Sequence, residues 1–451
     1  MRKNFSKVCE PMNIKIESTN KVFSAFGGLL HVSKMYKSLN LNRQIDGKLP
    51  KLKKLDAQRS KDKFEQLVYT FIAGAQCLDD AETLTKDAIF NIISNGTLYT
   101  AKSLGNFLRS FTDYQCKQLN QTLIDFAYQL REKLSLSKKS LTIDLDSTII
   151  PQCGKKMEGV GYAYNGIWGL DCIQAFDEYG FHYWHEVRNG GTYSSQNAEL
   201  IIHQIYSRLP KTKYFKKTRL YFRGDSAFCN SGVFNACHVK SAGFVIRMKE
   251  NMYKPIVHQV LNWKSQNPND KHRVRFYDNR ECDIGSTFYT SESCEHSCRV
   301  VLIRAVKNNV TKKTGLKEDD YNYHAWITNI GEHEFNNRKL IKFYCGRGQA
   351  ENYIKFLKEG LDLRHYPCQK LVANKAYGVI GGFAANIMRL LSLRDGLKKA
   401  KYAKKYRLKW VYIPCQIIRK ARYVVLRFMS HHEKEVTSCL NFIKKLHFGF
   451  P

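Results

Sequence analysis

The segment YCGRGQAENYIKFLKEG, residues 344–360, carries four polar side chains at fixed intervals. The row starts at Tyr344. The residues at offsets of +3, +7 and +14 are Arg347, Glu351 and Lys358. At about 100° per residue, these offsets place all of them within roughly 60° of the tyrosine on one helix. Two flanking glycines leave a second arrangement open, in which the tyrosine and the arginine lie in a turn before the helix. An amphipathic helix with solvated charges is the alternative to a functional row.

Aspartates follow the apolar runs of two expected strands. In SLTIDLDSTII, Asp144 and Asp146 point to the same side of one strand because their spacing is two. In LYFRGDSAF, Asp225 comes directly after the apolar run. A carboxylate within an apolar strand is costly to bury unless a cation pairs with it. A turn or capping role explains one such aspartate equally well, but not two strands that both carry one.

Together, Asp146, Asp225 and Glu351 have the chemistry of a site for hard divalent cations. Two such ions, about 3.5–4 Å apart, polarise a phosphodiester, activate a water or a 3′-hydroxyl, and stabilise the leaving oxygen. The basic and phenolic members of the row are suited to holding phosphates beside that site. The sequence therefore predicts phosphoryl transfer. Asp144 stays open as an alternative to Asp146. The Ser-Thr pair that follows Asp146 favours Asp146 as the metal ligand.

The net charge indicates the partner. The chain has 451 residues, with 73 Lys and Arg against 40 Asp and Glu, a formal balance of +33. An excess of this size predicts a polyanionic partner, most often nucleic acid, whose phosphates release counterions when cations neutralise them. A basic ribosome-like protein or a membrane-surface protein is the alternative.

The sequence shows no targeting signal, so we expect a cytoplasmic protein. The N-terminus, MRKNFSKVCEPMNIKIEST, is basic but has no apolar core of a secretory signal. No run approaches the roughly 18 apolar residues of a membrane span, so no membrane association is expected. The 14 cysteines are irregularly spaced, and we expect reduced thiols in a cytosol.

The pattern along the chain predicts five parts. Residues 1–135 are mainly helical and are expected to bind DNA, although a packing module without a DNA role fits nearly as well. From residue 136 the order β-β-β-α-β-α-β predicts a mixed sheet covered by helices. A β-rich insertion follows, with strands expected at HRVRFYDNRECDIG, RVVLIRAVK and YNYHAWITNI. The expected parts are residues 1–135, 136–250, 251–329, 330–395 and a basic C-terminal region, 396–451.

The Y-(2)-R-(3)-E-(6)-K spacing of the row resembles the signature of bacterial insertion-sequence transposases of the DDE class. Asp146 in DLDST resembles the first aspartate of that family, and Asp225 in FRGDSAF resembles the second. The 126-residue gap between Asp225 and Glu351 is similar to that of the group whose RNase H-like fold is interrupted by a β-strand insertion. The similarity covers roughly residues 140–393, and LDDAETL and SLGNFLRSF also resemble this group.

The resemblance implies that Asp146, Asp225 and Glu351 are the catalytic residues and bind two Mg²⁺ or Mn²⁺ ions. It implies DNA contacts near the transposon end by the other members of the row, which are Tyr344, Arg347 and Lys358. In some relatives a tryptophan of the insertion stacks on a flipped base. Trp263 and Trp326 are the candidates here, with a place in the core as the alternative for each.

We therefore expect an RNase H-like α/β fold: a mixed sheet with flanking helices, interrupted by a β-rich insertion and preceded by a helical N-terminal domain. The resemblance implies cleavage at terminal inverted repeats, joining of the 3′-hydroxyl ends to target DNA, and a homodimer assembled on paired ends of double-stranded DNA. The alternatives are another metal-dependent nuclease or recombinase on this fold, and a non-enzymatic basic DNA-binding protein.

Overall fold

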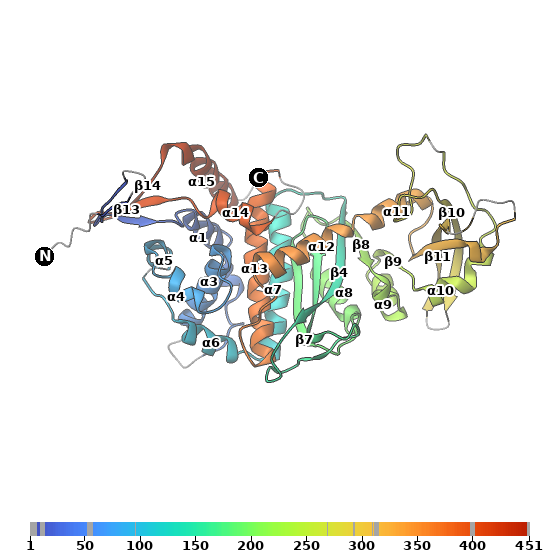
Figure 1. Cartoon of the computed structure of the whole chain (residues 1–451), viewed down its shortest axis with the longest axis horizontal. Coiled ribbons are helices and arrows are strands. Elements are labelled where there is room, and N and C mark those ends of the chain that lie inside the picture. The colour runs from blue at the N-terminus through green and yellow to red at the C-terminus, as the bar shows by residue number, and fades with distance from the viewer. Residues whose placement is uncertain are drawn as a thin grey trace.

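A computed structural model describes residues 7–9, 14–51, 57–94, 96–267, 269–291, 294–308, 310, 315–396 and 402–448. The molecule is elongated (Figure 1). N-terminal helices lie at one end, a large mixed sheet occupies the middle, and the β-rich insertion forms the other end. Within the described residues the largest sheet has nine strands, in the order β10-β11-β12-β9-β8-β4-β6-β5, with β7 also paired to β6.

The central strands follow the predicted order. They are β4 (Ser140–Pro151), β5 (Gly161–Tyr162), β6 (Trp168–Asp177), β7 (His182–Asn189), β8 (Arg219–Gly224) and β9 (Gly243–Arg247). Strands β4, β6 and β7 pair antiparallel, whereas β8 runs parallel to β4 and β9 runs parallel to β8. Parallel neighbours need crossover connections, which here contain α8 (Ala198–Ser207) and α9 (Ser231–Val239). The carboxyl ends of β4, β8 and β9 therefore meet at one edge of the sheet.

The insertion extends this sheet instead of forming a separate one. Its strands are β10 (Asp283–Ser291), β11 (Cys294–Val306) and β12 (Tyr321–Thr328), all antiparallel. Strand β12 pairs with β9, with Trp326 opposite Arg247. The strand expected across HRVRFYDNRECDIG was wrong in its first part, because a turn with Asn279 at φ 64° returns the chain there and Phe276 bonds back to Arg280.

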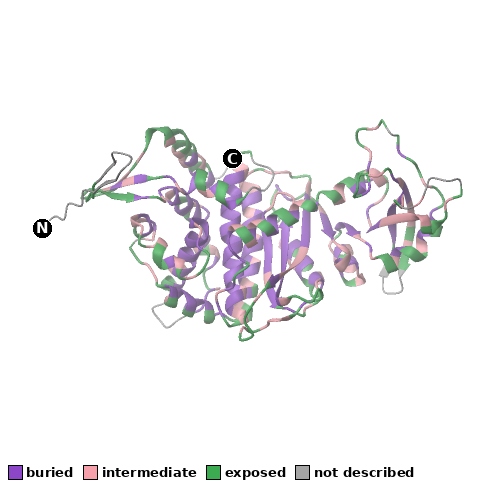
Figure 2. Cartoon of the chain, in the orientation of Figure 1, coloured by how far each residue is buried: buried purple, intermediate pink, exposed green. Residues whose placement is uncertain are grey.

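The helices of both ends of the chain cover the sheet. Helices α7 (Asp113–Lys133) and α13 (Leu371–Arg394) pack on β7, and α13 also packs on α3 (Ala57–Ala73) and α6 (Ala101–Arg109). One hydrophobic core therefore joins the N-terminal helices to the sheet. By length and composition α13 passes for a membrane span, but 94 % of its most apolar stretch is buried inside the protein, as Figure 2 shows.

Smaller N-terminal elements complete this end. They are β1 (Lys7–Cys9), β2 (Ile14–Ile16), β3 (Val22–Ser24), α1 (Leu29–Ser38), α2 (Leu41–Gln44), α4 (Asp80–Leu84) and α5 (Ala88–Ile93). The C-terminal region contributes α14 (Ala403–Trp410), β13 (Cys415–Arg419), β14 (Val424–Phe428) and α15 (Glu433–Phe448). Strand β13 pairs with β3, and α15 packs on α1. The two ends of the chain thus form one unit, which the sequence did not predict. The division into five parts stays a prediction.

Candidate active site

Asp146 lies within β4, just past the last residue that pairs with β8, and Asp225 lies just beyond the carboxyl end of β8. The parallel register places Asp144 beside Arg223, so the aspartates two residues further along each strand come next to each other. Asp225 lies just beyond β8, where its Oδ1 accepts a hydrogen bond from the Ala227 backbone N–H at 2.9 Å. The other carboxylate oxygen of Asp225, Oδ2, faces the site beside β4.

Arg347 joins the two aspartates. Its Nη2 lies 3.0 Å from Oδ1 of Asp146 and 3.8 Å from Oδ2 of Asp225. Because one nitrogen reaches both carboxylates, these carboxylates are close neighbours. Burial raises the pKa of Asp146 to about 6, and the negative charges of Asp225 and Glu351 act in the same direction, whereas Arg347 opposes them. The site thus holds more negative charge than one guanidinium neutralises.

Glu351 brings the third carboxylate. It lies in the first turn of α12 (Gly348–Lys355) and lines an open cavity of about 480 Å³ together with Asp146, Thr148 and Lys358. Glu351 and Asp146 thus line one cavity, and Asp225 lies next to Asp146. Within the described residues, no three His, Cys, Asp or Glu side chains are already close enough to share a metal ion.

The row of polar residues does not form a single stripe. Tyr344 belongs to α11 (Asn337–Cys345), Arg347 lies in the joint between α11 and α12, and Lys358 lies in a π-helical turn, η4 (Phe356–Gly360). Neither arrangement left open by the glycines is fully observed, because Arg347 lies in a turn before α12 but Tyr344 lies in a separate helix. Because a π-turn changes the angular spacing, the simple count of about 100° per residue does not place Lys358 correctly.

Lys358 instead contacts β4. Its Nζ donates to Thr148 Oγ1 at 3.3 Å and to the Ile149 carbonyl at 3.2 Å. Burial lowers the pKa of Lys358. The ammonium therefore stands beside Asp146 at the wall of the cavity. Tyr344 is less accessible: its ring lies 5.7 Å from that of Trp326, and burial raises the pKa of its hydroxyl.

Asp144 has a different environment from Asp146. It is 1 % exposed, and both of its oxygens accept hydrogen bonds from Arg223, each at 2.7 Å. Arg223 also donates to the Phe343 carbonyl, which fixes the end of α11 against the sheet. Asp144 is thus engaged in a buried ion pair, whereas Asp146 opens to the cavity. The signal available in the sequence was Arg223, a cation within the strand that ends just before Asp225.

A family model described as "Transposase DDE domain group 1" matches residues 6–447 of the chain. The chain belongs to this transposase family. It is a family of enzymes whose activity is DNA transposition, so the recognition of a DDE transposase, of an enzyme and of transposition is confirmed. No curated protein matches the chain. A solved structure of the piggyBac transposase synaptic complex with hairpin DNA is similar at 11 % identity, with a TM-score of 0.41, over 94 % of this chain and 82 % of that one.

The donor atoms of this transposase fit the divalent metal that DDE enzymes generally use. All three side chains offer carboxylate oxygens, which Mg²⁺ and Mn²⁺ prefer. Burial is the main cause of the raised pKa of Asp146, and the charges of Asp225 and Glu351 add to it, so an added cation would favour the ionised carboxylate. That Asp146, Asp225 and Glu351 would hold this metal stays a prediction.

The two tryptophans predicted to stack on a base are both packed against protein. Trp326 is 5 % exposed. Trp263 is covered by the Arg304 guanidinium, 4.5 Å from its ring centroid. Among the described Phe, Tyr and Trp rings of the insertion, Tyr277 and Phe288 are the exposed ones, at 71 % and 64 %. The core alternative describes Trp326, and base stacking by either ring stays a prediction that this packing does not favour.

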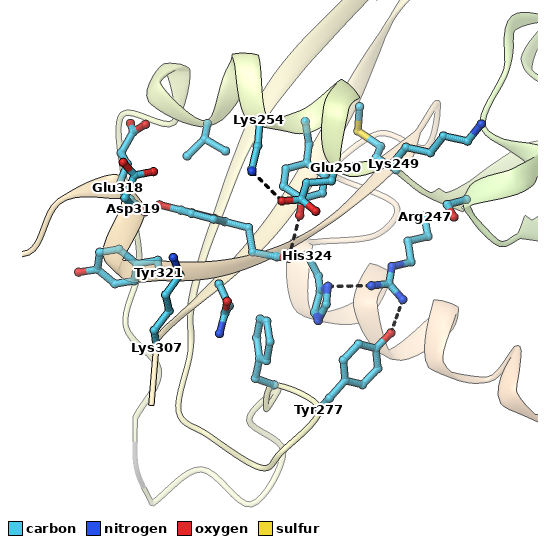
Figure 3. A pocket seen from close by; sticks show the side chains of 17 residues that line it. Arg247, Lys249, Glu250, Lys254, Tyr277, Lys307, Glu318, Asp319, Tyr321 and His324 are labelled. Carbon is cyan, nitrogen blue, oxygen red and sulfur yellow. Dashed lines mark hydrogen bonds and ion pairs between the residues drawn. The ribbon is translucent and has the colours of Figure 1, made fainter. Parts of the chain in front are cut away.

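A second cavity, of about 780 Å³, begins beside the aspartates at Ser226 and extends along the insertion (Figure 3). Arg247 donates to Tyr277 Oη at 2.6 Å and pairs with His324 Nδ1 at 3.0 Å, and Lys249 donates to Tyr193 Oη at 2.7 Å. Both cations thus have neutral partners. Sequence reasoning missed them, although Arg247 ends β9 and Lys249 follows it at the edge where Asp225 lies.

Proposed function

We propose that this transposase cuts DNA at the terminal inverted repeats of its element and joins the freed 3′-hydroxyl ends to target DNA. The observation that supports this best is the meeting of Asp146, Asp225 and Glu351 beside basic side chains at one edge of the sheet. We further propose that it belongs to the bacterial insertion-sequence group with a β-strand insertion, because its row of Tyr, Arg, Glu and Lys has the spacing of that group's signature.

Two Mg²⁺ or Mn²⁺ ions held by the three carboxylates would supply the polarisation of the phosphodiester and the activation of the attacking oxygen. Asp146 must be ionised for that role. Burial works against ionisation, and Arg347 at 3.0 Å works for it. In the absence of added cations, Arg347 therefore keeps part of the site's negative charge neutralised.

The basic residues around the carboxylates would hold the DNA strand. Lys358 stands on the cavity wall beside β4, and Arg347 is within reach of phosphates once other cations neutralise the aspartates. Tyr344 packs behind Arg347 and would position it. On the other side, Arg247 and Lys249 continue the positive surface along the second cavity. The DNA strand would thus pass over the carboxylates between two groups of cations.

We further propose that the active form is a homodimer on two paired DNA ends, acting in the cytoplasm on the nucleoid. Cysteines whose side chains the structure describes are free thiols, which is compatible with a reducing compartment.

A strand-transfer assay tests the proposal. Duplexes carrying the two ends of the element are incubated with the full chain, a supercoiled plasmid and Mg²⁺ or Mn²⁺. We expect nicking at the ends and covalent joining of the labelled 3′ ends to the plasmid. Cutting without joining would identify another nuclease of this fold. Binding without any metal-dependent nicking would identify a non-enzymatic DNA-binding protein.

A further inference from the structure

Strands β13 and β14 form a two-stranded ribbon near the N-terminal end of the molecule (Figure 1). Its four-residue tip, Lys420–Tyr423, is closed by a hydrogen bond from the Lys420 backbone N–H to the Tyr423 carbonyl at 2.9 Å. The inner face is anchored by buried Cys415 and Ile417, opposite Ser24 and Val22 of β3. Side chains alternate along a strand, so the residues between them face outward.

The outward face carries an ordered row across three strands. Gln416 of β13 lies directly opposite Arg427 of β14 on one side and Phe23 of β3 on the other. Phe23 is 58 % exposed. Arg427 donates from Nη1 to Gln416 Oε1 at 3.4 Å, so the guanidinium and the amide lie side by side. Arginine and glutamine are the side chains that bind guanine and adenine through paired hydrogen bonds, and an apolar ring contacts the thymine methyl group.

The tip carries only positive charge. Arg419, Lys420 and Arg422 are all exposed, and residues 415–430 contain no Asp or Glu. In the part of the chain that the structure describes, no carboxylate lies within ion-pair distance of these three residues or of Arg427. Cations without acidic partners at a protruding tip are complementary to a phosphate backbone.

The ribbon is held in a fixed relation to the candidate active site. Helix α14, which precedes it, packs on the π-helical turn that carries Lys358. Arg407 of α14 donates to the Gly360 carbonyl at the end of that turn at 2.6 Å and to the Ile72 carbonyl of α3 at 3.0 Å. A DNA duplex bound by the ribbon is thus held on the same folded unit that contains the carboxylates.

We propose that this ribbon enters the major groove of the DNA at the ends of the element and reads its sequence. The groove is about 12 Å wide and admits a two-stranded β-ribbon. Gln416 and Arg427, on the two strands of the ribbon, contact base edges, and Arg419, Lys420 and Arg422 contact the flanking phosphates. The inference rests on the proposed function, for which it names the surface that recognises the ends.

Fluorescence anisotropy of the full chain separates these roles. The probes are a duplex from the element's own end and an unrelated duplex of equal length and composition, each titrated from about 50 to 200 mM KCl. We expect Arg427→Lys, which keeps the charge but loses the paired hydrogen bonds, to reduce the preference for the end by about tenfold at an unchanged salt slope. The triple variant R419A/K420A/R422A should weaken binding to both duplexes and lower the slope by about two to three.

The matched control removes three exposed lysines that precede β8 in the chain, namely Lys211, Lys213 and Lys216. It should leave both the slope and the preference nearly unchanged. Equal effects of the control and the tip variant would overturn the proposal, as would an unchanged preference in Arg427→Lys with a wild-type melting temperature. If the wild-type chain itself does not prefer the element's ends, the proposed function fails instead, so the two failures are distinguishable.

Discussion

Arg347 lies 3.0 Å from Asp146, Nη2 to Oδ1, in the space between the carboxylates that would bind metal. A divalent cation and this guanidinium therefore compete for the same negative charge. We expect Arg347→Gln to bind Mn²⁺ about 3- to 10-fold more tightly without DNA, a change of about 1 kcal/mol, and to bind end DNA more weakly. Calorimetric titration with Mn²⁺ measures the first effect and anisotropy the second. Weaker Mn²⁺ binding by a folded variant would show that Arg347 supports the ion instead of competing with it.

Asp225→Asn and Glu351→Gln should abolish cutting, with losses of at least ~10³-fold, because each removes a charged oxygen from the proposed metal site. Binding to the element's end should stay within about twofold, since neither side chain is proposed to contact bases. A gel assay of end cutting, run beside anisotropy on the same preparation, checks both. Loss of binding by a variant that melts like the wild type would contradict the assignment.

We expect Asp144→Asn to reduce mainly the folding stability and Asp146→Asn to reduce mainly the cutting activity. Removing the Asp144 charge leaves Arg223 buried without its ionic partner, which should cost about 3–5 kcal/mol of folding stability. Asp146→Asn should abolish cutting with a smaller loss of stability, since its carboxylate opens to the cavity. Denaturant unfolding and the cutting assay compare the pair. Full activity of Asp146→Asn would transfer the metal-binding role away from this position.

The stability of the metal-free protein should carry the signature of Asp146. Its folded pKa of about 6 lies above its ordinary value, so the folded state holds this proton more tightly than the unfolded state does. The stabilisation is complete below pH ~4 and is lost as pH rises through about 6, by up to about 3 kcal/mol. The stability of the wild type relative to Asp146→Asn should therefore fall between pH ~4 and ~7 in EDTA. A rise in this stability difference over the same pH range would contradict a raised pKa of Asp146.

Lys358→Ala should weaken binding at the element's end and lower its salt slope by about one, because one phosphate contact is lost. Lys358 also bonds to Thr148 and Ile149 of β4, so a melting curve must accompany the measurement. Lys355→Ala provides the matched control, since that ammonium lines the same cavity but pairs with Glu359 at 3.9 Å. Equal slopes for the wild type and Lys358→Ala would remove Lys358 from the phosphate contacts.

Much of the sheet was predictable because its signals are local. The β-branched run around Asp146 and the apolar run before Asp225 define β4 and β8, and the helices between them require a parallel pair. Asp146 within β4 and Asp225 just beyond β8 then come together, because the two strands run parallel. Glu351 followed from the spacing of its row.

The features that escaped prediction depend on contacts between distant segments. The pairing of Asp144 with Arg223 depends on the register of β4 against β8. The position of Lys358 depends on a π-turn that packing on α14 supports. Pairing of β3 with β13 joins residues nearly 400 positions apart in the chain, and no periodicity in either segment encodes such a partner.

The burial of α13 on all sides has an evolutionary consequence. The faces of α13 are shared between the sheet and helices α3, α6 and α7. Neither the N-terminal helices nor the sheet can therefore be exchanged for a foreign module without exposing a long apolar surface. Elements of this kind must therefore change their DNA specificity by substitutions on existing surfaces, and recombination between relatives should be tolerated only where whole chains are inherited together.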